Sequence, residues 1–466
     1  MDTLTQELNR REEVKKALNS VGPGFCLAKW NQVTIHLGSG LTHSCHHPAP
    51  HKVSESEVRI NPSALHNTRQ KKRARRCMLE GGRPAECDYC WRVEDSSDQY
   101  SDRIFKSCEP WAWPTLEEIK ESDWQDDWFP RYVEISFSNK CNQRCLYCGP
   151  SFSSAWQQEA KKHGSFKLPQ MDYNGPLSEN DEKVQENEDN EYRKAFWKWW
   201  PDMFKHLHTF RITGGEPILD QNTIKVLRYI QEHWEENPNI GLAINSNLNI
   251  SEEKLEEVLE ILSDLSNNNK VRELIFYTSI EAVGSQAEYI RRGMHSDRFW
   301  KNVERVLQAL PKTTLTIMAT YNILSIYSYD DLIDKVYFLK KKYHHINRIY
   351  STAVMLDTSY LRWPTFLSVK LCSEEQKELI RKTAEKVESL RVRMLPEALP
   401  PRYCNFTPGF CDLEIEKIKR IYDYVCGEEP FDRDLNLERF QEFIKQVDER
   451  EGTKFVETFK EIGKNG

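Results

Sequence analysis

The chain has 466 residues, of which 39% are hydrophobic and 29% are charged, a balance typical of globular proteins with two or three domains. Its net charge of −7, from 65 basic and 72 acidic residues, argues against a general nucleic-acid binder, because phosphate-backbone affinity needs clustered positive charge. No stretch is apolar enough to span a bilayer and no secretory signal opens the chain, so we expect a cytoplasmic protein without a membrane partner.

The first predicted region, residues 1–130, carries four cysteines in a pattern that indicates a metal site. Two of them form a C-x2-C pair, and the other two flank a strand-like run that we expect to be a hairpin. Closely spaced cysteines in a cytosolic chain are more typical of metal binding than of disulfides. Four thiolates suit an iron–sulfur cluster or a structural zinc ion, the latter with His46 or His47 as a further candidate ligand. The four cysteines are Cys26, Cys45, Cys87 and Cys90.

A basic run follows in the same region, with six arginines and lysines between Arg69 and Arg76. The simpler interpretation is a solvated helix face. The alternative is a contact with an anionic ligand or RNA.

The second region, residues 131–362, alternates strand-like and helical segments. This alternation predicts an α/β fold with parallel strands, and six such units predict a partial (β/α)6 TIM-like barrel. The expected strands are 132–137, 209–213, 242–246, 274–280, 315–320 and 348–355. The expected helices are 222–234, 251–265, 297–310 and 330–343.

Directly after the first of these strands, three cysteines are spaced C-x3-C-x2-C: Cys141, Cys145 and Cys148, with Tyr147 before the last. Three thiolates can hold three irons of a cubane cluster and leave the fourth iron open. A zinc ion would need a fourth ligand, and no neighbouring cysteine or histidine supplies one.

Polar residues also follow the next strands. Because the carboxyl ends of parallel strands meet at one edge of a sheet, these side chains should converge. They are Gly214, Gly215, Glu216, Asn245, Ser279, Glu281 and Arg292.

Together these motifs resemble the radical S-adenosylmethionine (SAM) superfamily. The three cysteines match its C-x3-C-x-aromatic-C motif, and Gly214, Gly215 and Glu216 match its Gly-Gly-Glu motif. The resemblance implies a [4Fe–4S] cluster with SAM bound to its open iron. It also implies that Tyr147 lies near the adenine, and that the Gly-Gly-Glu motif contacts the amino group of SAM. The remaining positions resemble ribose- and carboxylate-contacting residues: Asn245, Ser279, Glu281 and Arg292.

The resemblance further implies an activity. One electron from the cluster would cleave SAM, and the 5′-deoxyadenosyl radical would take a hydrogen atom from a substrate. A flavodoxin- or ferredoxin-type protein is the expected electron donor. The N-terminal cysteines resemble a twitch domain with a second, auxiliary [4Fe–4S] cluster, which precedes the barrel here although twitch domains usually follow it.

Relatives with auxiliary clusters often modify peptides or proteins by oxidation, cross-linking or epimerisation, and others dehydrogenate sugars or cyclitols. We favour a peptide or protein substrate over a small molecule. An alternative of another class is a zinc-binding protein that contacts RNA through the basic helix.

The third region, residues 363–466, is expected to be helical. Cys372, shortly after the sixth strand, is a candidate hydrogen-atom donor to a substrate radical, although a packed thiol is the simpler interpretation.

Overall fold

The structure is a computed structural model that describes residues 3–175, 190–344, 352–393, 406–428 and 430–460. The chain divides into two compact units. The first comprises residues 1–138, 183–214 and 233–243, and the second comprises residues 139–182, 215–232 and 244–466.

The first unit is built on a mixed sheet in which β1 and β8 each pair in parallel with β4, while β1-β2 and β2-β3 are antiparallel. The β1-β2 hairpin confirms the one expected between Cys26 and Cys45, but a short helix, α2 (Ala28–Asn31), precedes it. The strands are β1 (Gln32–His36), β2 (Leu41–His43), β3 (His51–Lys52), β4 (Tyr132–Ser136) and β8 (Thr209–Thr213).

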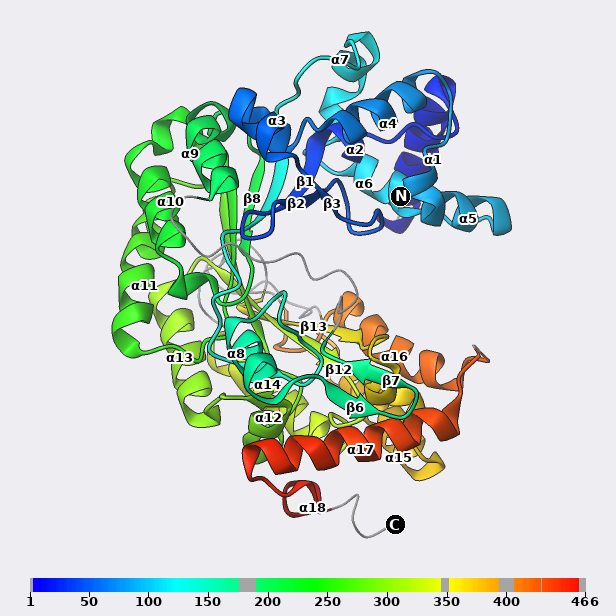
Figure 1. The fold of residues 1–466 in the computed structure, drawn as a ribbon, viewed down its shortest axis with the longest axis vertical. Coiled ribbons are helices and arrows are strands. Elements are labelled where there is room, and N and C mark those ends of the chain that lie inside the picture. The colour runs from blue at the N-terminus through cyan, green and yellow to red at the C-terminus, as the bar shows by residue number, and fades with distance from the viewer. Residues whose placement is uncertain (1–2, 176–189, 345–351, 394–405, 429, 461–466) are drawn as a thin grey trace. The chain divides into compact units, whose positions relative to one another are not determined.

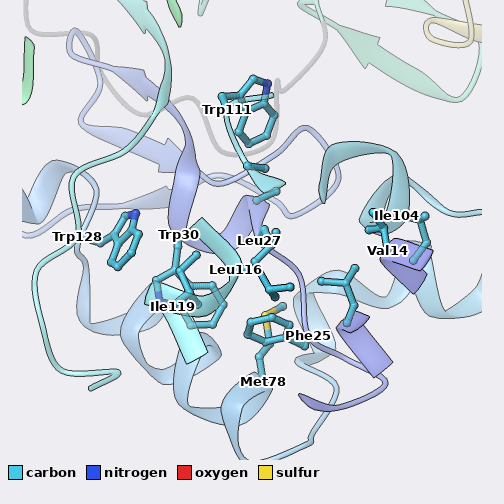
Figure 2. Close-up of a cluster of buried hydrophobic side chains, with 13 residues drawn as sticks. Val14, Phe25, Leu27, Trp30, Met78, Ile104, Trp111, Leu116, Ile119 and Trp128 are labelled. Atoms are coloured by element: carbon cyan, nitrogen blue, oxygen red, sulfur yellow. The ribbon is translucent and has the colours of Figure 1, made fainter. Parts of the chain in front are cut away.

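Short helices and loops of this unit enclose a hydrophobic core, which Figure 2 shows. Trp30, Leu27 and Phe25 lie at its centre and are at most 1% exposed, and Cys26 and Cys87 pack against its edge. The helices of the unit are α1 (Thr3–Val21), α3 (Glu55–Ile60), α4 (Arg69–Leu79), α5 (Asp88–Ser96), α6 (Asp102–Cys108), α7 (Leu116–Glu121) and α9 (Glu191–Phe204).

The basic run lies on α4, and the interpretation as a solvated face is wrong for two of its members. Lys71 and Arg75 are buried. The Arg75 guanidinium donates to Asn67 Oδ1 at 2.8 Å and to the carbonyl of Lys29 at 3.4 Å, because a buried guanidinium must find acceptors inside the protein. Arg69, Arg73 and Arg76 remain exposed.

The second unit contains the parallel strands β10 (Glu273–Ser279), β12 (Thr314–Tyr321) and β13 (Val354–Tyr360). Two two-stranded sheets accompany them: β5 (Arg144–Cys145) with β11 (Arg291–Arg292), and β6 (Phe166–Leu168) with β7 (Met171–Tyr173). Strand β9 (Gly241–Asn245) spans the division between the units.

Helices cover much of the second unit, and its last long helix, α17, runs beside the β6-β7 hairpin (Figure 1). There Gln446 donates to the carbonyl of Lys167 at 2.8 Å. The helices are α8 (Ser154–His163), α10 (Gln221–Glu232), α11 (Glu252–Asn267), α12 (Gly284–Ile290), α13 (Ser296–Ala309), α14 (Tyr329–Lys342), α15 (Glu374–Ser389), α16 (Asp412–Cys426), α17 (Arg433–Glu451) and α18 (Phe455–Thr458).

The predicted α/β class with parallel strands is confirmed, and the architecture is consistent with a partial barrel followed by a helical C-terminal region. The four predicted barrel helices agree with α10, α11, α13 and α14. The sixth strand was predicted too early: β13 is Val354–Tyr360, and part of the expected range lies outside the described residues. The division into three domains stays a prediction.

Within the described residues, no helix combines the length and the apolar character that a membrane crossing requires.

Candidate active site with two cysteine groups

Cys141, Cys145 and Cys148 lie on one loop between β4 and α8, and helix α8 holds that loop in place. The N-cap Ser153 donates its hydroxyl to the carbonyl of Gln143 at 2.7 Å. The Trp156 indole N–H donates to the carbonyl of Cys145 at 2.9 Å. The loop is thus fixed mainly through its backbone.

The three thiols are close enough to affect one another's ionisation. Burial and the neighbouring Cys145 raise the pKa of Cys141 to about 12, and burial with both other cysteines raises the pKa of Cys148 still further. Burial also raises the pKa of Cys145. Burial and the neighbouring sulfurs therefore oppose ionisation of these thiols, and a positively charged centre such as a metal cluster would favour it.

A guanidinium also lies beside this group. Arg291 Nη1 is 3.7 Å from Cys145 Sγ, and its Nε and Nη2 donate to Glu281 Oε2 at 2.9 and 2.7 Å. Its Nη2 also donates to the hydroxyl of Tyr147 at 2.6 Å, and that hydroxyl donates to Glu281 Oε2 at 3.1 Å. The sequence did not single out Arg291.

Glu281 retains an unused acceptor. Its side chain is 1% exposed, and its Oε1 is buried without a hydrogen-bond partner. An unpartnered buried carboxylate oxygen is costly, so a ligand donor such as a hydroxyl fits this position.

Gly215 and Glu216 pack under the start of the cysteine loop. A Cβ on Gly215 would lie 2.4 Å from the carbonyl oxygen of Lys140 and 2.7 Å from that of Asn139, so only glycine fits. The backbone N–H of Glu216 donates to the same Lys140 oxygen at 2.6 Å.

The Glu216 carboxylate is also used within the chain. It accepts the backbone N–H groups of Ile218 at 3.1 Å and Asn247 at 2.5 Å. Burial raises its pKa to about 7, although these hydrogen bonds act in the opposite direction. Asn247, which the sequence analysis did not select, also lies 3.9 Å from Cys141 Sγ through its Nδ2.

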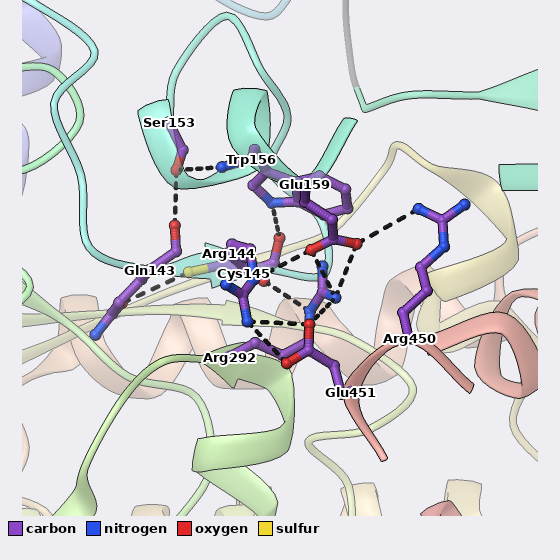
Figure 3. Close-up of polar contacts among 9 residues, drawn as sticks. All are labelled: Gln143, Arg144, Cys145, Ser153, Trp156, Glu159, Arg292, Arg450 and Glu451. Atoms are coloured by element: carbon purple, nitrogen blue, oxygen red, sulfur yellow. Dashed lines mark hydrogen bonds and ion pairs between the residues drawn. The ribbon is translucent and has the colours of Figure 1, made fainter. Parts of the chain in front are cut away.

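Arg292 belongs to a buried ion cluster, which Figure 3 shows. Its Nη1 is 3.0 Å from both Glu159 and Glu451, and Arg144 lies 3.1 Å from Glu159 and 2.7 Å from Glu451. Arg450 lies 3.5 Å from Glu159. Because Arg144 lies between two cysteines of the loop, this cluster connects the loop to the end of α17.

Neighbouring residues of a strand point to opposite faces, which explains why Arg291 and Arg292 have different partners. In β11 they pair with Cys145 and Arg144 of β5 respectively. The predicted contact of Arg292 with a ligand carboxylate stays a prediction.

The other predicted positions are at strand ends as expected. Asn245 ends β9 and Ser279 ends β10, and both are half-buried. Gly214 follows β8 with φ of +127°, and a Cβ there would lie 2.7 Å from Ser136 Oγ. Cys372 is 2% exposed after β13, and burial raises its pKa to about 11. Their roles stay predictions.

The first unit contains the second cysteine group. Cys26, Cys45, Cys87 and Cys90 line one pocket together with Lys29. Burial and the other three cysteines raise the pKa of Cys26 to about 12, and burial raises that of Cys90 to about 11.

Lys29 provides positive charge to this pocket. It is 3% exposed and pairs with Glu86. Burial lowers the pKa of Lys29, but the charges of Cys87 and Glu86 outweigh it and the net pKa is raised. Burial raises the pKa of Cys87, while the charge of Lys29 and a hydrogen bond from it lower it.

The spacing of the sulfurs bears on which metal fits. Sulfurs around one tetrahedral zinc ion lie about 3.8 Å apart, given a Zn–S distance of about 2.3 Å. Among the described residues, only one group of three or more candidate ligands has all its atoms within 4.8 Å, and it contains no cysteine. In neither cysteine group do all the sulfurs lie within 4.8 Å of one another.

Residues 135–326 match the sequence model of the Radical SAM superfamily. The chain carries a radical SAM domain. This domain contains the three-cysteine loop, Glu216, Glu281 and Arg291, and the superfamily that it matches implies a [4Fe–4S] cluster and SAM as cofactors.

Two solved structures similar to this chain are both of SuiB from Streptococcus suis. The SAM-bound structure is 15% identical, with a TM-score of 0.31, and the match covers 73% of this chain and 74% of SuiB. The structure bound to the precursor peptide SuiA is 13% identical, with the same TM-score and coverage. No curated protein sequence gave a significant match.

We predict that Gly215→Ala disrupts the cysteine loop of the radical SAM domain, because its Cβ would overlap the backbone of Asn139 and Lys140. Anaerobically reconstituted protein should lose most of the iron that the three-cysteine loop binds. Gly427→Ala is the control, because a Cβ at Gly427 would lie 3.4 Å from the nearest neighbouring atom, which is ordinary contact. Equal iron content in the two variants would contradict the predicted role of this close packing.

We also predict that Glu159→Gln destabilises the protein by on the order of 3 kcal/mol, because it leaves the Arg292 guanidinium with one buried carboxylate fewer. Urea unfolding and iron content measure the effect. The control is Glu388→Gln, which breaks a more exposed pair with Arg391. It should change neither the urea unfolding midpoint nor the iron content. A normal unfolding midpoint for Glu159→Gln would show that the cluster adds no stability.

Proposed function

We propose that the protein cleaves SAM reductively at a [4Fe–4S] cluster held by Cys141, Cys145 and Cys148, and takes a hydrogen atom from a peptide or protein substrate. One observation carries the proposal. Three neighbouring thiols have raised pKa values, and one of them, Cys145, lies beside Arg291, which holds the Glu281 carboxylate with its unsatisfied oxygen, inside a domain that matches the Radical SAM superfamily.

The chain's own residues provide the binding and the charge. Arg291 offsets the negative charge of three thiolates and orients Glu281 through two hydrogen bonds. The free oxygen of Glu281 is suited to accept a hydroxyl of the ribose. Gly215 leaves room for close backbone packing under the loop. A [4Fe–4S] cluster held by Cys141, Cys145 and Cys148 would supply the electron for reductive cleavage of SAM, the chemistry that the superfamily implies.

We further propose that Cys26, Cys45, Cys87 and Cys90 hold an auxiliary [4Fe–4S] cluster. The support is the shared pocket and the buried cation Lys29, which stabilises thiolate charge. A fully ligated cluster transfers electrons and does not bind substrate, so its role would be to accept the electron left after substrate oxidation.

The proposal of a peptide or protein substrate rests on the resemblance to radical SAM enzymes with auxiliary clusters. Dehydrogenation of a sugar or cyclitol is the second candidate within the same chemistry. A mass change on a co-expressed peptide supports the first, and two-electron oxidation of a small alcohol supports the second.

The SAM site is tested with Cys145→Ala. With dithionite and SAM under anaerobic conditions, we expect 5′-deoxyadenosine formation to fall to background, because one cluster ligand is lost. Chromatography with mass detection measures the product. Cys426→Ala, which changes an exposed cysteine, should retain full turnover. Turnover in Cys145→Ala at the wild-type rate would refute the assignment.

The auxiliary site is tested with Cys87→Ala. We expect it to lose about half of the iron while SAM cleavage persists, because the two cysteine groups use separate ligands. Iron, sulfide and zinc analysis with electron paramagnetic resonance measures the outcome. A wild-type protein with zinc in place of this iron would instead support a structural zinc site.

A further inference from the structure

His46, His47 and Asp102 form a third group of candidate ligands, which contains no cysteine. Their ligand atoms all lie within 4.8 Å of one another, and no other set of three among the described residues does so. The Nε2 atoms of both histidines lie near the same carboxylate oxygen, Asp102 Oδ2, at 3.1 and 2.7 Å.

The group is held in shape before any ligand arrives. The His47 ring stacks on Tyr89, with ring centroids 3.7 Å apart and an interplanar angle of 14°. Tyr89 lies on α5 between Cys87 and Cys90, and Asp102 begins α6. The His47 side chain is 15% exposed and that of His46 is 60% exposed, so the group opens to solvent on the His46 side.

A divalent cation could bind the carboxylate of Asp102 and one nitrogen of each imidazole together, because these ligand atoms lie within 4.8 Å of one another.

We propose that His46, His47 and Asp102 bind one divalent first-row transition-metal ion. Two imidazole nitrogens and one carboxylate oxygen are ligands that such ions prefer, with Zn²⁺ and Fe²⁺ as the expected class. Three protein ligands leave coordination positions open for water or for a group on a bound molecule. The ion would lie at the rim of the pocket that contains Cys45, since His47 and Asp102 also line it.

The test uses the full-length protein with its iron–sulfur sites reconstituted, freed of loosely bound metal with a chelator, and titrated anaerobically with Co²⁺. Visible absorption reports ligation by nitrogen and oxygen through weak d–d bands, whereas thiolate ligation gives intense charge-transfer bands. Isothermal calorimetry gives the affinity and the number of ions. We expect one ion per chain with nitrogen and oxygen ligation.

His46→Gln and Asp102→Asn should each weaken Co²⁺ binding by at least about tenfold, because even the loss of an outer partner of a metal ligand costs about 10–100-fold. The matched control is His233→Gln, which breaks a pair between one histidine and Glu236 at 2.8 Å and should leave binding unchanged. Circular dichroism checks that each variant is folded.

Three outcomes would overturn the proposal. Wild-type protein could take up no Co²⁺. His46→Gln and Asp102→Asn could bind it as tightly as the wild type. The spectrum could show thiolate ligation, which would place the ion among the cysteines. None of these outcomes concerns SAM cleavage, so the result is independent of the proposed radical chemistry.

Discussion

The burial of several thiols at close quarters is the constraint on which the rest of the structure depends. In each cysteine group, burial and neighbouring sulfurs oppose ionisation, so the thiolates need positive charge nearby. The chain provides part of it through Arg291 in one unit and Lys29 in the other. Both cations are themselves buried and are held by a carboxylate, Glu281 or Glu86, so each site is a balanced set of charges.

The three-cysteine loop is stabilised by residues far from it in the sequence. Helix α8 fixes its backbone, Gly215 and Glu216 support its start, and Glu451 at the end of α17 pairs with Arg144 inside it. A ligand-binding loop is ordinarily the least stable part of a domain. Here it is tied to helices and strands, which would limit its movement when a cofactor is gained or lost.

The cysteine motifs and the α/β pattern could be predicted from the sequence, because local spacing and hydrophobic period determine both. The sequence could not show which of Arg291 and Arg292 lies beside the cysteines, because this depends on which face of a two-residue strand meets them. The burial of Lys71 and Arg75 was missed for a similar reason, since a run of charge gives no sign of the side of α4 that packs inward. The ion cluster of Arg144, Glu159 and Glu451 joins positions about 300 residues apart, which no local pattern reveals.

The parallel pairing of β1 with β4 has a consequence for dissecting this protein. Five residues of β1, from Gln32 to His36, pair in register with Tyr132 to Ser136. A shortened protein that starts after residue 130 would therefore expose the backbone donors and acceptors along β4, and an unpaired edge invites strand addition from another molecule. The contributions of the two cysteine groups are thus better separated by single substitutions than by deletion.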